Sequence, residues 1–344
     1  MALEVQIKKK LGKFQLDTAF TVESGMFAIL GASGCGKSMT LKCIAGIERP
    51  DEGRIVLDGY VLFDSEKKIN LPPKKRKVGY MFQDYALFPT MTVEQNIRAG
   101  MGKKANPQEV QSYIRRFHLT GLEKHRPAQL SGGQKQRVAM ARMLAAKPEL
   151  LLFDEPFSAL DSHLKWKLQQ EMQQTFQALG KPALFVSHNR DEVYQLCDTV
   201  GCMNQGKLEV IEPVKEFFHN PKTVTAAMLS GCKNISPVVK NADGTIAARD
   251  WGLRLRIPDM PENIAAVGIR AHDFCPVQEN GENVLTVHDG YVAEDMFEWT
   301  YFVRSSTEHE WIQWKIAKQD WQADTPKLPK YLKINAEKLL FLQS

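Results

Sequence analysis

The segment from Gly31 to Ser38 has the residue types and spacing best suited to chemistry. It fits G-x-x-x-x-G-K-[ST], the pattern of a phosphate-binding loop, and reads Gly31-Ala32-Ser33-Gly34-Cys35-Gly36-Lys37-Ser38. Glycines let the backbone turn tightly close to an anion, and the amides exposed there bind phosphate oxygens. The Lys37 ammonium can reach the β- and γ-phosphates, and the Ser38 hydroxyl can bind Mg²⁺. We therefore expect all eight residues to bind the phosphates of a nucleotide such as ATP.

Two carboxylates follow the apolar run Leu150-Leu151-Leu152-Phe153. A strand that ends at Asp154 places this carboxylate beside the phosphate loop, where it can hold Mg²⁺. Glu155, one residue later, can polarise a water for attack on the γ-phosphate. Two adjacent acids are a weak signal alone, but the phosphate loop upstream strengthens it. The sequence thus predicts Asp154 as a metal residue and Glu155 as a catalytic one.

The elements that must position these groups alternate between strand and helix. Continuous apolar runs are typical of buried parallel strands, and amphipathic segments between them are typical of helices. The expected strands are 26–30, 77–82, 150–153 and 183–186, and the expected helical segments are 39–45, 92–146 and 164–179. This order predicts an α/β domain with a parallel sheet covered by helices. Alternating strands are expected before it, near 3–7, 14–18 and 55–57, with a turn at Asp58-Gly59.

The composition changes near residue 232. Five of the six tryptophans lie beyond it, among short alternating segments. Turn signals recur there at Asp243-Gly244, Asn280-Gly281 and Asp289-Gly290. Short strands with such turns predict a small all-β barrel or sandwich. We place the boundary between about 222 and 235, which gives domains 1–231 and 232–344.

Bulk properties exclude several classes of protein. A chain of 344 residues with 43% hydrophobic and 25% charged residues is typical of a two-domain globular protein. A net charge of +5, dispersed along the chain, argues against a nucleic-acid partner. We see no apolar run long enough to span a bilayer and no leader peptide, so a membrane should be contacted only through a partner. The six cysteines lack metal spacing and are expected to be reduced thiols, with Cys35 accessible in the loop.

The run Leu130-Ser131-Gly132-Gly133-Gln134 resembles the signature of ATP-binding cassette proteins. The chain resembles them from about residue 2 to 230, with every motif in the family's order. The resemblance implies a cassette-type fold with a helical subdomain at about 84–148, followed by an OB- or TOBE-like barrel. It also implies roles for Gln83, which contacts Mg²⁺ and the lytic water, for the segment Ser158-Ala159-Leu160-Asp161, and for His188, which contacts the γ-phosphate.

The same resemblance implies a homodimer. In cassette ATPases the signature completes the ATP site of the opposite subunit, so that two ATPs lie in a head-to-tail dimer. Ser131 and two glycines open a helix whose amides can bind phosphate, which is redundant beside the first loop within one chain. Ser131, Gly132, Gly133, Gln134 and Asp161 are accordingly expected to bind ATP in trans.

The class of cassette protein follows from what accompanies the motifs. The stretch between Lys37 and Ser131 leaves room only for the helical subdomain, and there is no second cassette. This favours an import cassette. For an import cassette the resemblance implies a place at the cytoplasmic face of the inner membrane, two transmembrane permease subunits and, indirectly, an extracytoplasmic solute-binding protein. A soluble ATPase outside transport is the remote alternative.

The solute is indicated only by resemblance. The stretch 267–273 is similar to a segment of the barrels appended to importers of sugars, polyamines, iron and oxyanions. The stretches 53–59, 75–84 and 231–235 are similar to the molybdate branch, so molybdate, tungstate or sulfate is favoured over sugar, polyamine or iron. The barrel either binds an inhibitory oxyanion or serves as a dimer contact.

Two local features depart from simple expectations. The family stacks adenine on an aromatic residue at a position that falls near Leu11, which is not aromatic, and Phe14 lies three residues on. The run Pro72-Pro73-Lys74-Lys75-Arg76-Lys77-Val78 imitates a nuclear import signal, but we interpret it as a solvated basic turn.

Overall fold

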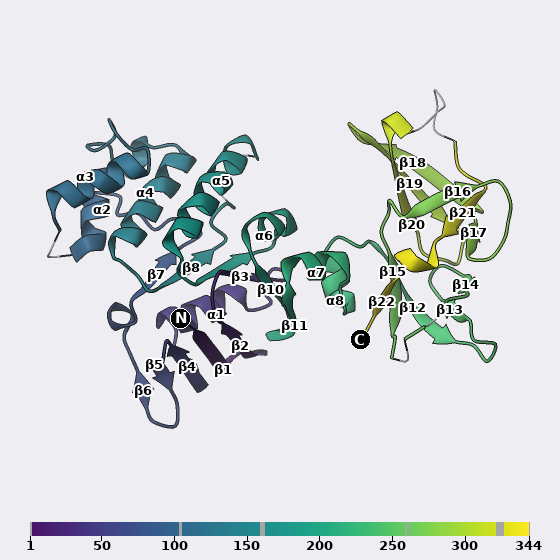
Figure 1. The fold of residues 1–344 in the computed structure, drawn as a ribbon, viewed down its shortest axis with the longest axis horizontal. Helices are drawn as coiled ribbons and strands as arrows, with labels where there is room; N and C mark the ends of the chain where they lie inside the picture. The colour runs from purple at the N-terminus through teal and green to yellow at the C-terminus, as the bar shows by residue number, and fades with distance from the viewer. Residues whose placement is uncertain are drawn as a thin grey trace. The chain divides into compact units, whose positions relative to one another are not determined.

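A computed structural model describes residues 2–102, 105–158, 162–258, 260–261, 263–320 and 327–343 (Figure 1). The chain divides into two compact units, Met1–Val214 and Lys215–Ser344. No helix within the described ranges is both long and apolar enough to cross a bilayer.

The first unit is built on a six-stranded sheet in the order β11-β10-β3-β9-β8-β7. Neighbouring strands run parallel except for β10 and β11. The predicted strands are confirmed, and every residue of β3, β8 and β9 is buried. The strands are β3 (Met26–Leu30), β7 (Val78–Met81), β8 (Leu150–Asp154), β9 (Ala183–Ser187), β10 (Thr199–Asn204) and β11 (Lys207–Pro213).

A second, antiparallel sheet has the order β2-β1-β4-β5-β6. Its strands are β1 (Leu3–Leu11), β2 (Phe14–Val22), β4 (Glu52–Leu57), β5 (Tyr60–Asp64) and β6 (Ile69–Asn70). Alternate residues of β1 are buried, as the sequence pattern predicts for a strand with one face on the core. The expected turn joins β4 to β5, where Asp58 and Gly59 have φ of 50° and 78°.

The helices cover both faces of the parallel sheet. Helix α1 (Lys37–Ala45) shares a core with the antiparallel sheet and with Leu150 and Leu152 of β8. Successive residues of a strand face opposite ways, so Phe153 lies on the other face, where its ring meets Phe176 of α5 (Ser162–Leu179) with centroids 4.8 Å apart. The remaining helices of this region are α2 (Val93–Met101), α3 (Pro107–Arg116), α4 (Gly132–Ala145) and α6 (Arg190–Leu196), with short 3₁₀ turns at Pro73–Lys75 and Pro127–Gln129. Helices α2, α3 and α4 all lie between β7 and β8 in the chain and contact one another (Figure 1).

The second unit is predominantly β, as expected, and its strands form three antiparallel sheets. The sheet orders are β14-β13-β12-β15-β22, β16-β21-β17 and β18-β19-β20. Its core is built around Trp251, Trp314 and Tyr301, all nearly inaccessible. The elements are α7 (Val214–His219), α8 (Val224–Leu229), β12 (Asn234–Lys240), β13 (Ile246–Ala248), β14 (Leu253–Leu255), β15 (Ala266–Ile269), β16 (Phe274–Val277), β17 (Val284–Thr286), β18 (Asp289–Glu294), β19 (Glu298–Arg304), β20 (Ile312–Ala317), β21 (Tyr331–Ile334), β22 (Leu340–Leu342) and 3₁₀ turns Lys318–Asp320 and Ala336–Lys338.

The division of the chain falls after Val214, the first residue of α7, whereas the sequence placed the domain boundary after α8, at 231/232. Arg270 explains the difference, because its guanidinium donates to the carbonyls of Phe218 and Ser230 and so ties both helices to the β unit. A bridge between Thr223 and Gln343 adds a second tie. The stretch 267–273, which is similar to the barrels of importers, thus contains the residue that holds α7 and α8 to the strands of this unit.

Two expectations of turns are corrected. Asp289-Gly290 opens strand β18 instead of making a turn; glycine is needed at 290 because a Cβ there would lie 2.7 Å from the Phe302 carbonyl oxygen.

Arg76 is not solvated, since it is 1% exposed. Its guanidinium donates to the carbonyls of Leu71, Cys43 and Ile44 and to the Asn70 side chain, each at 2.8 Å. The basic run therefore contains a buried residue that satisfies carbonyls at the end of α1.

Candidate nucleotide-binding site

The predicted site residues follow strands that end at one edge of the parallel sheet. Strands β3, β9, β8 and β7 are consecutive neighbours and run in the same direction. Gly31, His188 and Glu155 come directly after β3, β9 and β8, and Asp154 is the last residue of β8. Ligand sites of open α/β sheets lie outside these carboxyl ends. The topology therefore gathers groups that are far apart in the sequence.

The loop between β3 and α1 is shaped for close backbone approach. A Cβ at Gly31 would lie 2.3 Å from the Met203 carbonyl oxygen, so no side chain fits there. Gly36, immediately before α1, has φ of 112°, a conformation that glycine adopts without strain. The Cys35 carbonyl accepts from the amide of Gly206 at 2.9 Å, which anchors the loop to the β10–β11 turn. This backbone at the start of a helix fits a phosphate group.

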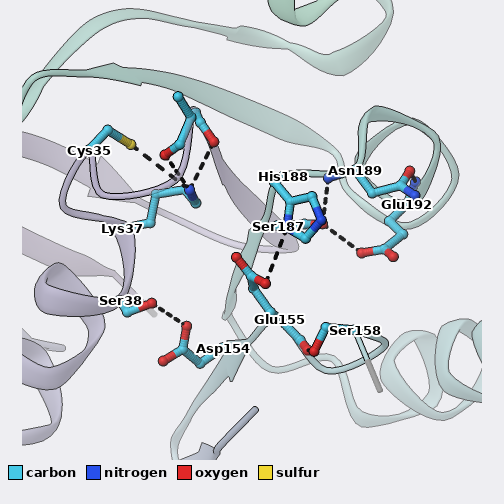
Figure 2. A network of polar contacts seen from close by, with 12 residues as sticks. Cys35, Lys37, Ser38, Asp154, Glu155, Ser158, Ser187, His188, Asn189 and Glu192 are labelled. Atoms are coloured by element: carbon cyan, nitrogen blue, oxygen red, sulfur yellow. Dashed lines mark hydrogen bonds and ion pairs between the residues drawn. The ribbon is translucent and has the colours of Figure 1, made fainter. Parts of the chain in front are cut away.

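Lys37 lies inside the curve of the loop. Its side chain is almost wholly buried, and its ammonium donates to the carbonyls of Gly31 and Ala32, both at 2.8 Å (Figure 2). The positive charge is therefore held among the loop's own backbone groups, where a phosphate would need it.

Ser38 and Asp154 meet across α1 and β8. The Ser38 hydroxyl donates to Asp154 Oδ1 at 2.6 Å (Figure 2), and the Tyr80 hydroxyl donates to Asp154 Oδ2 at 2.8 Å. Hydroxyl and carboxylate oxygens are ligands that Mg²⁺ prefers, so these two residues fit the predicted metal role. Burial, together with the adjacent Asp154 charge, raises the pKa of Tyr80 well above its usual range, so its hydroxyl remains a donor. Sequence reasoning missed Tyr80, although a phenol beside the predicted strand end was a visible signal.

Glu155 is held in an uncommon backbone conformation and faces His188. Its φ is 46°, which costs a non-glycine residue about 1–3 kcal/mol and persists only where the surroundings enforce it. The amide of Glu155 donates to the Val186 carbonyl at 3.0 Å, and its own carbonyl accepts from the Ser158 amide and hydroxyl. Its carboxylate Oε2 lies 3.1 Å from His188 Nδ1 (Figure 2). The structure thus brings together the two residues that the sequence assigned to catalysis.

A buried network fixes the turn that presents His188. The Ser187 hydroxyl donates to Glu192 Oε2 at 2.6 Å and accepts from the Asn189 amide at 2.9 Å (Figure 2). Glu192 is 4% exposed and also pairs with Lys165 of α5. Sequence reasoning did not assign these polar residues, because only the tertiary fold places α5 beside this turn.

The signature residues lie at the start of α4. Ser131 caps the helix: its hydroxyl accepts from the Gln134 amide, and the Gln134 side chain accepts from the Ser131 amide at 2.9 Å. Among the described residues, no hydrogen bond or ion pair joins 131–134 to the phosphate loop of the same chain. Gln83, two residues beyond β7, is exposed. Asp161, Ala159 and Leu160 lie outside the described residues.

Cys35 differs from the expectation of an accessible thiol. It is 7% exposed and belongs to the core that α1 shares with the antiparallel sheet. Burial raises the pKa of its thiol, and the nearby Lys37 charge opposes this only in part. The thiol is therefore mostly protonated at neutral pH.

An open hollow of about 680 Å³ adjoins the phosphate loop. Residues 32–35 of the loop form one side, and Phe14 of β2 and Asn204 to Gln205 form others. The Phe14 ring also lies against Gly36: a Cβ built at Gly36 would be 3.0 Å from Phe14 Cζ. Leu11 is 38% exposed at the end of β1 and does not line this hollow.

Comparison with known proteins gives consistent results. Residues 17–158 match the family model described as ABC transporter. The chain is 40% identical over 222 residues to the molybdenum import ATP-binding protein ModC of Paramagnetospirillum magneticum, covering 64% of this chain and 61% of that protein. It is 42% identical over 282 residues to the molybdate/tungstate import ATP-binding protein WtpC of Thermococcus kodakarensis, covering 80% and 83%. The Fe(3+) ions import ATP-binding protein FbpC of Haemophilus influenzae is 35% identical over 287 residues, covering 82% and 81%.

A solved structure shares the fold over part of this chain. It is a dimeric, post-hydrolysis state of the ATP-binding cassette MJ0796 bound to ADP and phosphate, with a TM-score of 0.53 and 26% identity. The match covers 62% of this chain and 99% of that one.

Proposed function

Because this chain belongs to the ABC transporter family of ATP-binding proteins, we propose that it is the ATP-hydrolysing subunit of an importer. The observation that carries the proposal is the convergence of Lys37, Ser38, Asp154, Glu155 and His188 at one sheet edge. These side chains supply a phosphate cradle, metal ligands and a base in one place.

The loop and Lys37 bind the triphosphate. The backbone amides of residues 31–38 and the positive end of α1 provide donors for phosphate oxygens, and Lys37 adds a full charge. Ser38 and Asp154 would hold Mg²⁺, with Gln83 as a further ligand. When bound, the ion neutralises charge that develops on the phosphates. Lys37 stabilises the same charge in the transition state.

Glu155 acts as the base that orients and polarises the attacking water. Its backbone strain is enforced by bonds to Val186 and Ser158, so the carboxylate is held ready before the nucleotide arrives. His188 contacts this carboxylate through Nδ1 and, like Lys37, is expected to contact the γ-phosphate. The network of Ser187 and Glu192 holds His188 in place.

The signature acts on a second copy of the chain. Ser131 to Gln134 present a capped helix start, which is a ready anion site, yet they make no bond to the loop of their own chain within the described ranges. The dimeric state of MJ0796 with ADP and phosphate supports a dimer here. We propose a head-to-tail homodimer with two equivalent sites, to which Asp161 also contributes.

The relatives are named import ATP-binding proteins, which supports a role beside membrane partners. We propose that two transmembrane permease subunits dock on this chain at the cytoplasmic face of the inner membrane, and that a solute-binding protein acts indirectly from outside. Dimer closure by ATP shifts the permease equilibrium only as far as ATP favours the closed state. Molybdate or tungstate is the favoured solute and sulfate a further oxyanion. Sugar, polyamine or iron is the alternative, and similarity to iron and spermidine/putrescine import ATP-binding proteins supports the last two.

We further infer that Phe14, and not Leu11, contacts the nucleobase. Phe14 lines the hollow beside the phosphate loop, whereas Leu11 does not. Its ring offers an apolar face of the kind on which bases stack.

Phosphate release by the purified chain tests the central proposal. Wild type should hydrolyse ATP only with Mg²⁺, and Lys37→Ala should abolish turnover. Ser131→Arg should also abolish turnover although Ser131 does not contact the loop of its own chain; thermal unfolding would check that loss of the cap alone is not the cause. A fully active Ser131→Arg protein would refute the shared site.

The solute is tested by reconstitution with candidate permease subunits. ATPase stimulation would be compared for binding protein loaded with molybdate, tungstate, sulfate, ferric iron or spermidine. Stimulation by ferric iron alone or by spermidine alone would replace the oxyanion proposal with that alternative.

A further inference from the structure

Tyr80 holds the carboxylate of Asp154 from a third element. The Tyr80 hydroxyl donates to Asp154 Oδ2 at 2.8 Å, while Ser38 of α1 donates to Oδ1 at 2.6 Å. The two donors therefore occupy different oxygens and approach from β7 and α1. A carboxylate held at both oxygens loses the rotation about its terminal bond, which a single donor would leave free.

The tyrosine ring is itself well fixed. Strand β7 pairs in parallel with β8, and Tyr80 lies opposite Leu152, two residues before Asp154. The ring packs on the shared core and on Phe82, with ring centroids 4.3 Å apart. The hydroxyl thus points at Asp154 because strand pairing and ring packing leave it little freedom.

Ser38 and Tyr80 differ in what a bound metal would ask of them. Ser38 is an expected metal ligand, so its hydroxyl oxygen must serve the metal. Among the described residues, Ser38 and Tyr80 are the side chains that donate to the Asp154 carboxylate, and Tyr80 is the one not expected to bind the metal. Partners that orient a ligating carboxylate commonly change metal affinity by 10- to 100-fold when removed.

We propose that Tyr80 is a positioning residue for the metal site: its hydroxyl orients Asp154 and thereby sets how strongly Mg²⁺ strengthens nucleotide binding. This inference rests on the proposed ATPase function. Tyr80 should therefore affect nucleotide binding in the presence of Mg²⁺ and not binding of the phosphates by the loop alone.

The test compares nucleotide affinity with and without metal in the full chain. A fluorescent, non-hydrolysable ATP analogue is titrated in EDTA and again in saturating MgCl₂, and the ratio of the two dissociation constants gives the gain due to Mg²⁺. For Tyr80→Phe, which removes only the hydroxyl, the EDTA value should be unchanged and the gain should fall about tenfold. In an Asp154→Asn background the same substitution should change the gain little, because the two residues then act as one unit.

Tyr113→Phe is the matched control. The Tyr113 hydroxyl donates to the Leu144 carbonyl at 3.1 Å, between α3 and α4, and does not contact Asp154. Its loss should leave the gain unchanged, and thermal unfolding of both variants checks folding. A Tyr80→Phe gain within twofold of wild type, or an equal loss of affinity in EDTA and in Mg²⁺, would overturn the inference. If wild type bound no nucleotide at all, the proposed function would fall and this inference with it.

Discussion

Glu155→Gln separates chemistry from folding at the site. Gln has nearly the shape of Glu, so the backbone at φ 46° and the backbone bonds to Val186 and Ser158 remain. Only the carboxylate is lost, and with it the charge near His188 Nδ1. Removal of a general base slows turnover by about 10²–10⁴, which corresponds to roughly 2.7–5.5 kcal/mol of transition-state stabilisation.

The expected change in folding stability is much smaller. The Glu155–His188 contact involves a histidine side chain that is 56% exposed, and pairs of this kind contribute less than about 1 kcal/mol. We therefore expect a large loss of phosphate release with little change in unfolding temperature. Because ATP then persists in the site, the variant should also elute as a dimer in gel filtration with ATP and Mg²⁺.

Glu149→Gln is the control for this prediction. Glu149 precedes the other end of β8 and pairs with Lys77 at 2.5 Å, away from the strand ends that form the site. Its substitution should leave turnover unchanged. If Glu155→Gln retained more than a tenth of wild-type turnover, or remained monomeric with ATP, the assignment of Glu155 as the base would be wrong.

Three further predictions follow from buried and lining residues. Arg76→Met should lower the free energy of unfolding by at least about 3 kcal/mol, because several buried acceptors lose their donor. In calorimetry this corresponds to a fall in unfolding temperature of about 6–12 °C. Lys75→Met, at an exposed residue, should change the unfolding temperature little. Thiol labelling of Cys35, followed by mass spectrometry, should be slower than labelling of the exposed Cys275. Its rate should rise about tenfold per pH unit up to pH 9, because the pKa of Cys35 is raised, and should fall when ATP is bound. Rapid labelling of Cys35 at pH 7 would contradict its burial. Phe14→Ala should weaken ATP binding by about 1 kcal/mol or more in calorimetry but leave triphosphate binding unchanged, whereas an equal effect of Leu11→Ala would contradict the assignment of the base site.

Much of the site could be read from the sequence because its motifs are local. The phosphate loop needs glycines, a lysine and a serine at fixed spacing, and each apolar run before a polar residue marks a buried strand end. These patterns predicted β3, β8 and β9 and the residues after them, and the structure confirms those strands. Local patterning also predicted a β-rich second unit.

Side-chain environments could not be read in the same way, because they depend on which elements become neighbours. Cys35 lies in a glycine-rich loop and Arg76 in a basic run, so both were expected to be accessible to solvent. Cys35 instead belongs to the core that α1 shares with the antiparallel sheet. The Arg76 guanidinium is buried against backbone carbonyls, two of them at the end of α1. Arg270 looked like a family marker, and the fold uses it to tie α7 and α8 to the β unit.

The sequence by itself determined which groups could bind phosphate and metal, since that chemistry depends on residue type and short spacing. The tertiary structure alone decided that Tyr80 would donate to the second oxygen of Asp154, and that Glu155 Oε2 would lie 3.1 Å from His188 Nδ1. The physical reason is the parallel order β3-β9-β8-β7, which brings distant strand ends to a single edge.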